Sequence, residues 1–175
     1  HNFQIRKHLL EYDDVMNQQR EVIYNRRSHA LKGESLREEL LDIIETYVDE
    51  KVQLYTAGRY ADDWDWENLQ NDFQKVFLTN LPAELQENAA LSQEDLTEEL
   101  KKTALAAYKR KEAQLTPKLT RRLERLAMLR SIDDKWREHL YEMDQLKEGI
   151  GLRAYGQKDP LLEYKSEGFR MFKEM

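Results

Sequence analysis

The chain has 175 residues, a formal net charge of −6 and charged side chains at 35% of its positions. It contains no cysteine, which excludes disulfides, zinc–thiolate sites, iron–sulfur clusters and cysteine nucleophiles. Six glycines and three prolines argue against a many-stranded β fold. The sequence also lacks an apolar run of about 18 residues, which a membrane-spanning helix would require.

The first predicted element is one long helix over residues 1–32. Gly33 follows basic residues and is expected to end this helix. At 1.5 Å per residue the helix is about 48 Å long, so we expect it to act as a spine. Its apolar residues recur at steps of three, four and seven, with a polar gap at Gln19: Ile5, Leu9, Tyr12, Met16 and Ile23.

The block 34–100 is strongly acidic, with 4 basic and 18 acidic residues. This predicts a separate acidic subdomain between basic-to-neutral flanks, although acidic, solvated helix faces give the same pattern. We expect a helix capped by Ser35 that ends near Gly58, and a short helix around Leu69 and Phe73. One loop is expected over Pro82 and the polar residues around Asn88. A further helix capped by Ser92 is predicted to continue to about Gln114.

The strongest periodic signal predicts a long helix that opens at Thr116-Pro117 and stops at Gly149-Ile150-Gly151. Residues 151–159 are predicted to form a loop, and Asp159-Pro160 to start the last helix, in which Gly168 allows close approach. Two helices joined in this way form a helical hairpin. The predicted fold class is therefore all-α.

Motifs for catalysis are weak in this sequence. No phosphate-binding P-loop occurs, and Gly149 and Gly151 follow a helix instead of a strand, so we interpret them as a helix stop. The four histidines lack metal-ligand spacing. The doublets Asp13-Asp14 and Asp133-Asp134 are expected to form salt bridges. The acidic balance argues against nucleic-acid binding. Trp136 is expected to be an interhelix anchor, and Tyr155, at the hairpin apex, a contact point.

Three stretches resemble SecA, the family of bacterial preprotein translocase motors. They are LLEYDDV at 9–15, DKWREHL at 134–140 and LRAYGQKDP at 152–160. The resemblance implies a long scaffold helix (1–33) packed against a two-helix finger (117–175), with a helical wing domain (34–116) inserted between them. Because the chain starts at His1 without a methionine or a signal peptide, we expect it to be a piece of a larger protein.

The resemblance also implies a function. The chain would be a non-catalytic module that scaffolds the motor domains, regulates ATP hydrolysis and contacts the translocating preprotein at the SecY channel through its finger loop. It would bind no cofactor, ATP and Mg²⁺ belonging to the nucleotide-binding domains of the parent. The implied partners are those domains, unfolded preprotein and the SecY channel, and the implied location is the cytoplasmic face of the plasma membrane.

The resemblance assigns residues to three groups. The preprotein and channel contact would be Arg153, Tyr155, Gln157 and Lys158. The interface with the motor domains would be Tyr12, Asp13, Asp14 and Arg20. The packing of scaffold helix against finger would use Leu9, Met16, Ile23, Leu129, Trp136 and Met143.

Two other hypotheses remain open from the residues alone. The seams at 5–23 and 119–150 are also typical of a free-standing helical adaptor or a self-associating coiled coil, so a homodimer stays open. A helical hydrolase is the third hypothesis, for which no site is found. The orientation and the partner of the wing also stay open.

Overall fold

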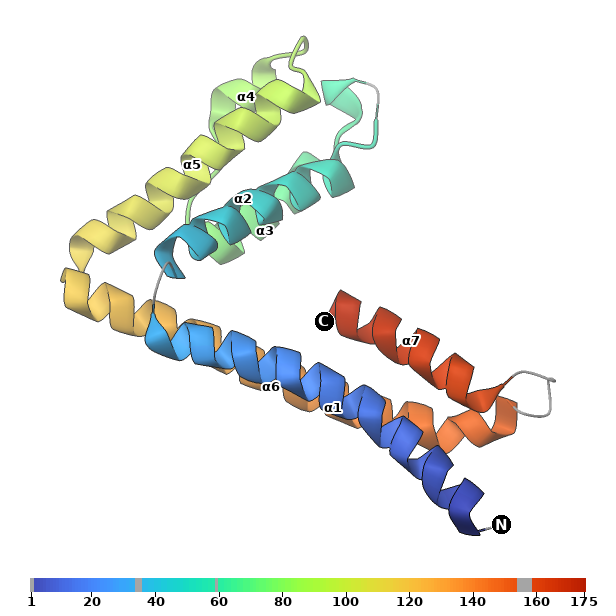
Figure 1. Ribbon diagram of the computed structural model, residues 1–175. Helices are drawn as coiled ribbons and strands as arrows, with labels where there is room; N and C mark the ends of the chain where they lie inside the picture. The colour runs from blue at the N-terminus through green and yellow to red at the C-terminus, as the bar shows by residue number, and fades with distance from the viewer. Residues whose placement is uncertain (1, 34–35, 59, 154–158) are drawn as a thin grey trace. The chain divides into compact units, whose positions relative to one another are not determined.

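The computed structural model describes residues 2–33, 36–58, 60–153 and 159–175, and the side chains at 10–33, 36–58, 60–150 and 159–175. This part of the chain holds seven α-helices, one 3-10 turn at Ala61–Asp63 and no strand, which confirms the all-α prediction (Figure 1). The helices are α1 (Asn2–Lys32), α2 (Leu36–Tyr55), α3 (Trp66–Phe77), α4 (Ala83–Glu87), α5 (Gln93–Gln114), α6 (Pro117–Arg153) and α7 (Pro160–Glu174).

The chain divides into two compact units. Unit 1 comprises residues 1–34 and 125–175, and unit 2 comprises residues 35–124. The division falls within α6, a few residues after its start at Pro117. The expected ranges 1–33, 34–116 and 117–175 stay predictions about the domains.

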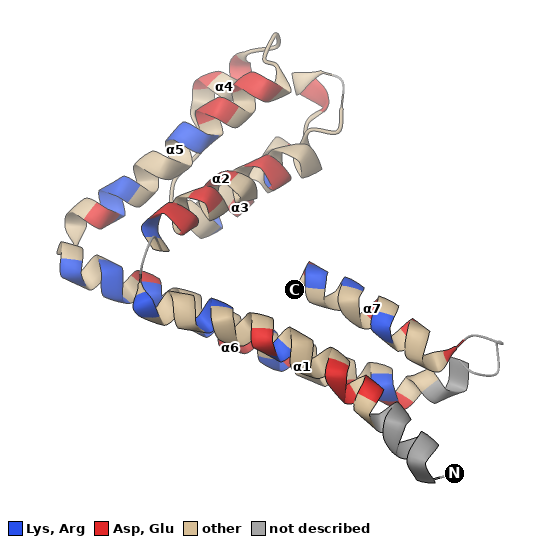
Figure 2. Ribbon diagram, in the orientation of Figure 1, with Lys and Arg blue, Asp and Glu red and all other residues tan. Residues whose placement is uncertain are grey.

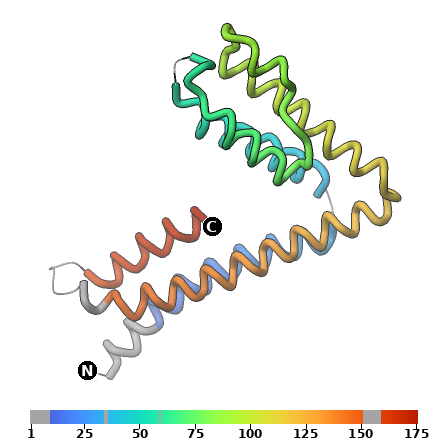
Figure 3. Tube along the Cα trace, turned by 180° about the vertical axis from the view of Figure 1, so that it is seen from behind, coloured from blue at the N-terminus to red at the C-terminus, as the bar shows by residue number. Residues whose placement is uncertain are grey.

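Unit 1 is built from α1, α6 and α7. The helix α7 runs parallel to α1, since Tyr12 and Gln19 of α1 contact Tyr164 and Gly168 of α7 in that order (Figures 1 and 3). A small apolar core between the helices includes Met143, which is buried. The helix α6 runs antiparallel to α1, through the successive pairs Asp13–Lys147, Gln19–His139 and Arg27–Asp133.

Unit 2 has a core of its own. The helices α2 and α5 pack along each other, and α3 packs against both. Phe73 of α3 is fully buried at its centre, and the indole Nε1 groups of Trp64 and Trp66 donate to the backbone carbonyls of Gly58 and Ala61. The other buried core residues are Val48, Val52, Leu69, Leu81, Leu85, Leu91, Leu96, Leu100 and Ala104.

Most predicted helix ends are confirmed. Gly33 adopts a left-handed φ of 72° after α1, and its N–H donates to the carbonyl of His29. The Ser92 hydroxyl accepts from the N–H of Asp95, and the Asp159 carboxylate accepts from the N–H groups of Leu161 and Leu162, as expected of N-caps. The Ser35 cap lies outside the described residues.

Two predictions about boundaries were wrong. The stretch between Pro82 and Asn88, expected to be a loop, forms the short helix α4, because Leu85 is buried in the core of unit 2. The helix α6 continues through Gly149 and Gly151 to Arg153. A glycine inside a helix costs only about 1 kcal/mol, and the burial of Ile150 on the hairpin core outweighs that cost.

The described acidic residues of block 34–100 lie on the helices and turns of unit 2 (Figure 2). Most of their side chains are exposed. The block therefore forms solvated helix faces around an apolar core. Among the residues that the structure describes, no helix combines the length and the apolar character needed to cross a membrane.

Candidate functional site

Gln19 lies at the centre of the junction of α1, α6 and α7. Its side chain is only 7% exposed, although it interrupts the apolar seam of α1. Its amide Nε2 donates to the backbone carbonyl of Gly168 on α7 at 3.1 Å. Its Oε1 lies 2.7 Å from Nε2 of His139 on α6. One side chain therefore connects α1 to both helices of the hairpin, and we call Gln19, His139 and the Gly168 carbonyl the polar clasp.

Gly168 lets α7 approach this junction. A Cβ at this position would lie 2.7 Å from Cε and 3.2 Å from Sδ of Met143, closer than side-chain atoms pack. The glycine is buried and leaves its carbonyl within reach of the Gln19 amide. The expected close approach at Gly168 is confirmed.

His139 is 1% exposed and lies between aromatic rings. The ring centroids of Trp136 and Phe172 are 5.7 and 5.5 Å from its own. Burial lowers the pKa of His139, and the nearby Glu142 raises it to a smaller extent. Its Nδ1 is buried and has no hydrogen-bond partner in the described part of the chain. His139 is therefore held as a neutral imidazole.

Ion pairs flank the polar clasp on both sides. Arg27 of α1 donates twice to the Asp133 carboxylate of α6, at 2.9 and 3.4 Å. Toward the other end, the Lys147 ammonium lies 3.6 Å from the Asp13 carboxylate and 5.9 Å from the ring centre of Tyr12. These groups are largely exposed and screened by solvent, so the pairs guide the pairing of helices more than they stabilise it.

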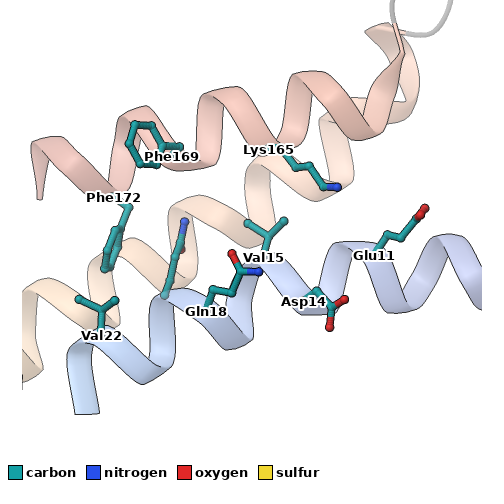
Figure 4. Close-up of a pocket in the computed structure, with 9 residues that line it drawn as sticks. Glu11, Asp14, Val15, Gln18, Val22, Lys165, Phe169 and Phe172 are labelled. Carbon is teal, nitrogen blue, oxygen red and sulfur yellow. The ribbon is translucent and has the colours of Figure 1, made fainter. Parts of the chain in front are cut away.

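A groove of about 470 Å³ lies between α1 and α7 on the same unit (Figure 4). Phe169 of α7 is largely exposed beside it, and Val22 of α1 is half exposed. Lys165, Glu11 and Asp14 supply its charged groups. The groove is lined by Glu11, Asp14, Val15, Gln18, Gln19, Val22, Lys165, Phe169 and Phe172.

The four residues expected at the motor-domain interface lie in different surroundings in the structure. The Tyr12 ring packs inward on Tyr164, with centroids 4.8 Å apart, and Asp13 pairs with Lys147. Asp14 lines the groove, and exposed Arg20 donates to Asn17 of its own helix at 3.0 Å. Their role as a motor-domain interface stays a prediction.

The expected packing residues lie along unit 1. Met143 is 1% exposed in the hairpin core, and Met16 of α1 packs against that core. The Trp136 ring is 6.4 Å from that of Phe172, which places it between the two hairpin helices. Ile23 and Leu129 are half-buried. Outside the described residues lie Tyr155, Gln157, Lys158 and the side chains of Leu9 and Arg153.

Sequence reasoning missed the polar clasp. The polar gap at Gln19 was its visible signal, because a glutamine in an apolar seam needs a polar partner. The spacing of the four histidines bears only on metal binding and gives no signal for the role of His139. The expectation that the acidic doublets form salt bridges is confirmed for Asp13, for Asp133 and for Asp134, which pairs with Arg137 at 3.2 Å.

Comparison with known proteins gives one consistent result. The family model described as the SecA wing and scaffold domain matches residues 1–175. The chain is 48% identical over 175 residues to the protein translocase subunit SecA of Pelotomaculum thermopropionicum, covering 99% of this chain and 20% of that protein. It is 48% identical over 180 residues to the subunit of Saccharopolyspora erythraea, covering 99% and 19%. It is 44% identical to that of Trichlorobacter lovleyi over 176 residues, covering 100% and 20%.

The chain therefore spans about one fifth of the length of these relatives.

Proposed function

This chain belongs to the family of SecA wing and scaffold domains, and we propose that it serves in protein translocation as the non-catalytic scaffold, wing and finger of a SecA motor. In this role α1 supports the nucleotide-binding domains of the parent, and α6 and α7 form the finger. ATP and Mg²⁺ bind to those other domains. The parent acts in the cytoplasm, at the inner face of the plasma membrane.

One observation carries the proposal. The helix α1 is tied to both hairpin helices through a single buried residue, and it also exposes apolar side chains. A helix that packs against the hairpin and still exposes apolar side chains has surface left to pack against further domains. The exposed apolar residues of α1 are Leu10, Val22, Tyr24 and Leu31.

The finger would act through Arg153, the last residue of α6, and through the residues between α6 and α7. Arg153, Tyr155, Gln157 and Lys158 would contact the unfolded preprotein at the SecY channel. In support, α6 ends at Arg153 and the Asp159 cap starts α7, so a helix lies on either side of residues 154–158. A tyrosine supplies apolar area and one hydrogen bond, which suits a polypeptide of varied sequence. Motion of the hairpin would be transmitted through α1 and so regulate ATP hydrolysis.

Mixing the chain with separately produced nucleotide-binding domains of its parent tests the proposal. We expect binding and a reduced rate of ATP hydrolysis. The chain alone should hydrolyse no ATP. If the chain instead sediments as a tight dimer and does not bind the motor domains, the self-associating adaptor is the better description and the proposal fails.

A further inference from the structure

We propose that Gln19 is the residue that positions α7 on α1, and that it does so only while His139 is neutral. The inference rests on the proposed function, because it names the joint between the scaffold helix and the finger. It assigns to the polar clasp a role beyond packing, since its state depends on one proton.

The hydrogen bonds fix the orientation of the Gln19 amide. A backbone carbonyl accepts and cannot donate, so the NH₂ group of Gln19 must face the Gly168 oxygen. The amide oxygen then faces His139 and must accept, so Nε2 of His139 carries the proton. The Nε2–H of His139 therefore donates to the Gln19 amide oxygen, and the Gln19 NH₂ group donates to the carbonyl of Gly168.

A second proton on His139 would have no acceptor. It would sit on Nδ1, which is buried and has no partner among the described residues. The resulting charge would lie among the rings of Trp136 and Phe172, on a side chain that is 1% exposed. Burying an unpaired donor and a charge is costly, and opening the junction to solvent relieves both costs.

The charged groups around His139 do not remove this cost. A cavity beside the ring, between α6 and α7, carries both signs of charge. From α1, the group that contacts His139 is the neutral Gln19 amide. Most of the charged residues are exposed and therefore screened. The facing groups are Lys135, Glu138 and Glu142 on α6, and Glu167, Arg170 and Glu174 on α7.

The direction of the pH dependence follows from the state of His139. Burial lowers the pKa of His139 in the folded chain below its ordinary value of about 6.5. In the open junction, the imidazole regains that ordinary value. The polar clasp therefore contributes fully above about pH 6.5, and its contribution falls as the pH drops below that value.

Hydrogen exchange of the full-length parent, read peptide by peptide, tests the proposal. After correction for intrinsic exchange, protection of α7 should fall between about pH 7.5 and about pH 5.5, by at most roughly tenfold, because about pH 5.5 lies one unit below the ordinary pKa of histidine. Peptides of α5 serve as the internal reference, because unit 2 contains no histidine. Equal protection of α7 at both pH values would overturn the proposal.

Substitutions sharpen the test. His139→Gln keeps an N–H near the position of Nε2 and does not titrate, so α7 protection should become independent of pH. Gln19→Glu should reverse the dependence. An ionised carboxylate cannot donate to the Gly168 carbonyl, whereas a protonated one donates there and still accepts from His139. Protection of α7 in Gln19→Glu should therefore rise as the pH falls.

Gln18→Glu is the matched control, because it makes the same change on the neighbouring exposed side chain. Its α7 protection should depend on pH as it does in the unsubstituted protein. The same pH dependence of α7 protection in Gln19→Glu and Gln18→Glu would contradict the proposal. If Gln19→Glu does not fold, the unsubstituted protein and His139→Gln still decide the question. The pH dependence of α7 protection does not depend on binding of the separate motor domains. The proposed function can therefore fail while the role of the polar clasp is supported. The role of the polar clasp can equally fail while the proposed function is supported.

Discussion

Gln19 occupies a position in α1 where an apolar side chain would bury more favourable surface. A buried amide costs about 1–3 kcal/mol for each group left unpaired, and here both of its polar atoms are paired. Shifting α1 along the hairpin would leave the amide and His139 without partners. The glutamine therefore contributes chiefly to the register of the three helices, because wrong registers are penalised.

Gly168→Ala is expected to destabilise unit 1. Overpacking against buried Met143 costs about 1–3 kcal/mol, whereas the better helix propensity of alanine returns about 1 kcal/mol. The net loss should be about 1 kcal/mol in denaturant unfolding followed by tryptophan fluorescence, in which Trp136 reports on unit 1 and Trp64 and Trp66 report on unit 2. Gly149→Ala is the control, since a Cβ there meets no atom within 4 Å. It should stabilise the chain, and equal effects of the two substitutions would contradict the close approach.

At the scale of elements, one carboxylate joins three helix ends of unit 2. Glu112, near the end of α5, accepts from Arg37 of α2 at 2.8 and 3.1 Å and pairs with Arg121 of α6. The hydrogen bonds from Arg37, followed by those from Arg121, lower the pKa of Glu112 to about 2. Tyr108 lies beside this group, where burial and its bond to Glu124 raise its pKa to about 12.

Glu112→Gln should weaken unit 2 at neutral pH and abolish part of its acid sensitivity. The folded pKa is lowered, so the stabilisation is present above the ordinary value of about 4.5 and is lost as the pH falls toward 2. Since both arginines are partly exposed, we expect a loss of about 1 kcal/mol at pH 6.

The measurement is urea unfolding at about pH 6 and about pH 3. The difference between Glu112→Gln and the unsubstituted chain should shrink at the lower pH. Glu98→Gln, on an exposed face of the same helix, makes the same change of charge and should have little effect at either pH. A constant difference at both pH values would show that the pKa of Glu112 is not lowered.

Local signals predicted the helices well, and tertiary contacts decided the rest. The N-caps Ser92 and Asp159 could be predicted from the sequence, because an N-cap depends on neighbouring backbone groups alone. The short helix α4 escaped prediction because the burial of Leu85 depends on distant helices. Gln19 could be noticed, but its partners lie 120 and 149 residues away in the sequence.

At the scale of the whole molecule, two separate cores are accompanied by many exposed apolar side chains. Tyr24, Leu126, Tyr141, Leu162 and Phe169 are each more than half exposed in unit 1. Apolar side chains that stay exposed are candidates for contact with another part of a protein. The surface favours attachment to the remainder of a longer protein, in agreement with the fifth of its relatives that this chain spans.

Tyr155→Ala in the full-length parent should lower preprotein translocation by roughly five- to tenfold, because loss of one aromatic contact is worth about 1 kcal/mol. Basal ATP hydrolysis should persist, since the proposal places nucleotide binding elsewhere. Tyr141→Ala, an exposed tyrosine on the same hairpin outside the loop, is the control. Equal loss of translocation and hydrolysis would count against a role of the loop in gripping the preprotein.

The core of unit 1 also decides where the protein is open to chemical damage. All five methionines of the chain lie in this unit, and because cysteine is absent, unit 2 contains no sulfur. Peroxide should therefore oxidise Met171 and Met175 before Met143, which is sealed in the core. Peptide mass spectrometry can follow this order. Unit 2 would pass through oxidative stress unmodified at sulfur, while a sulfoxide at Met171 would loosen the packing of α7 on the core of unit 1.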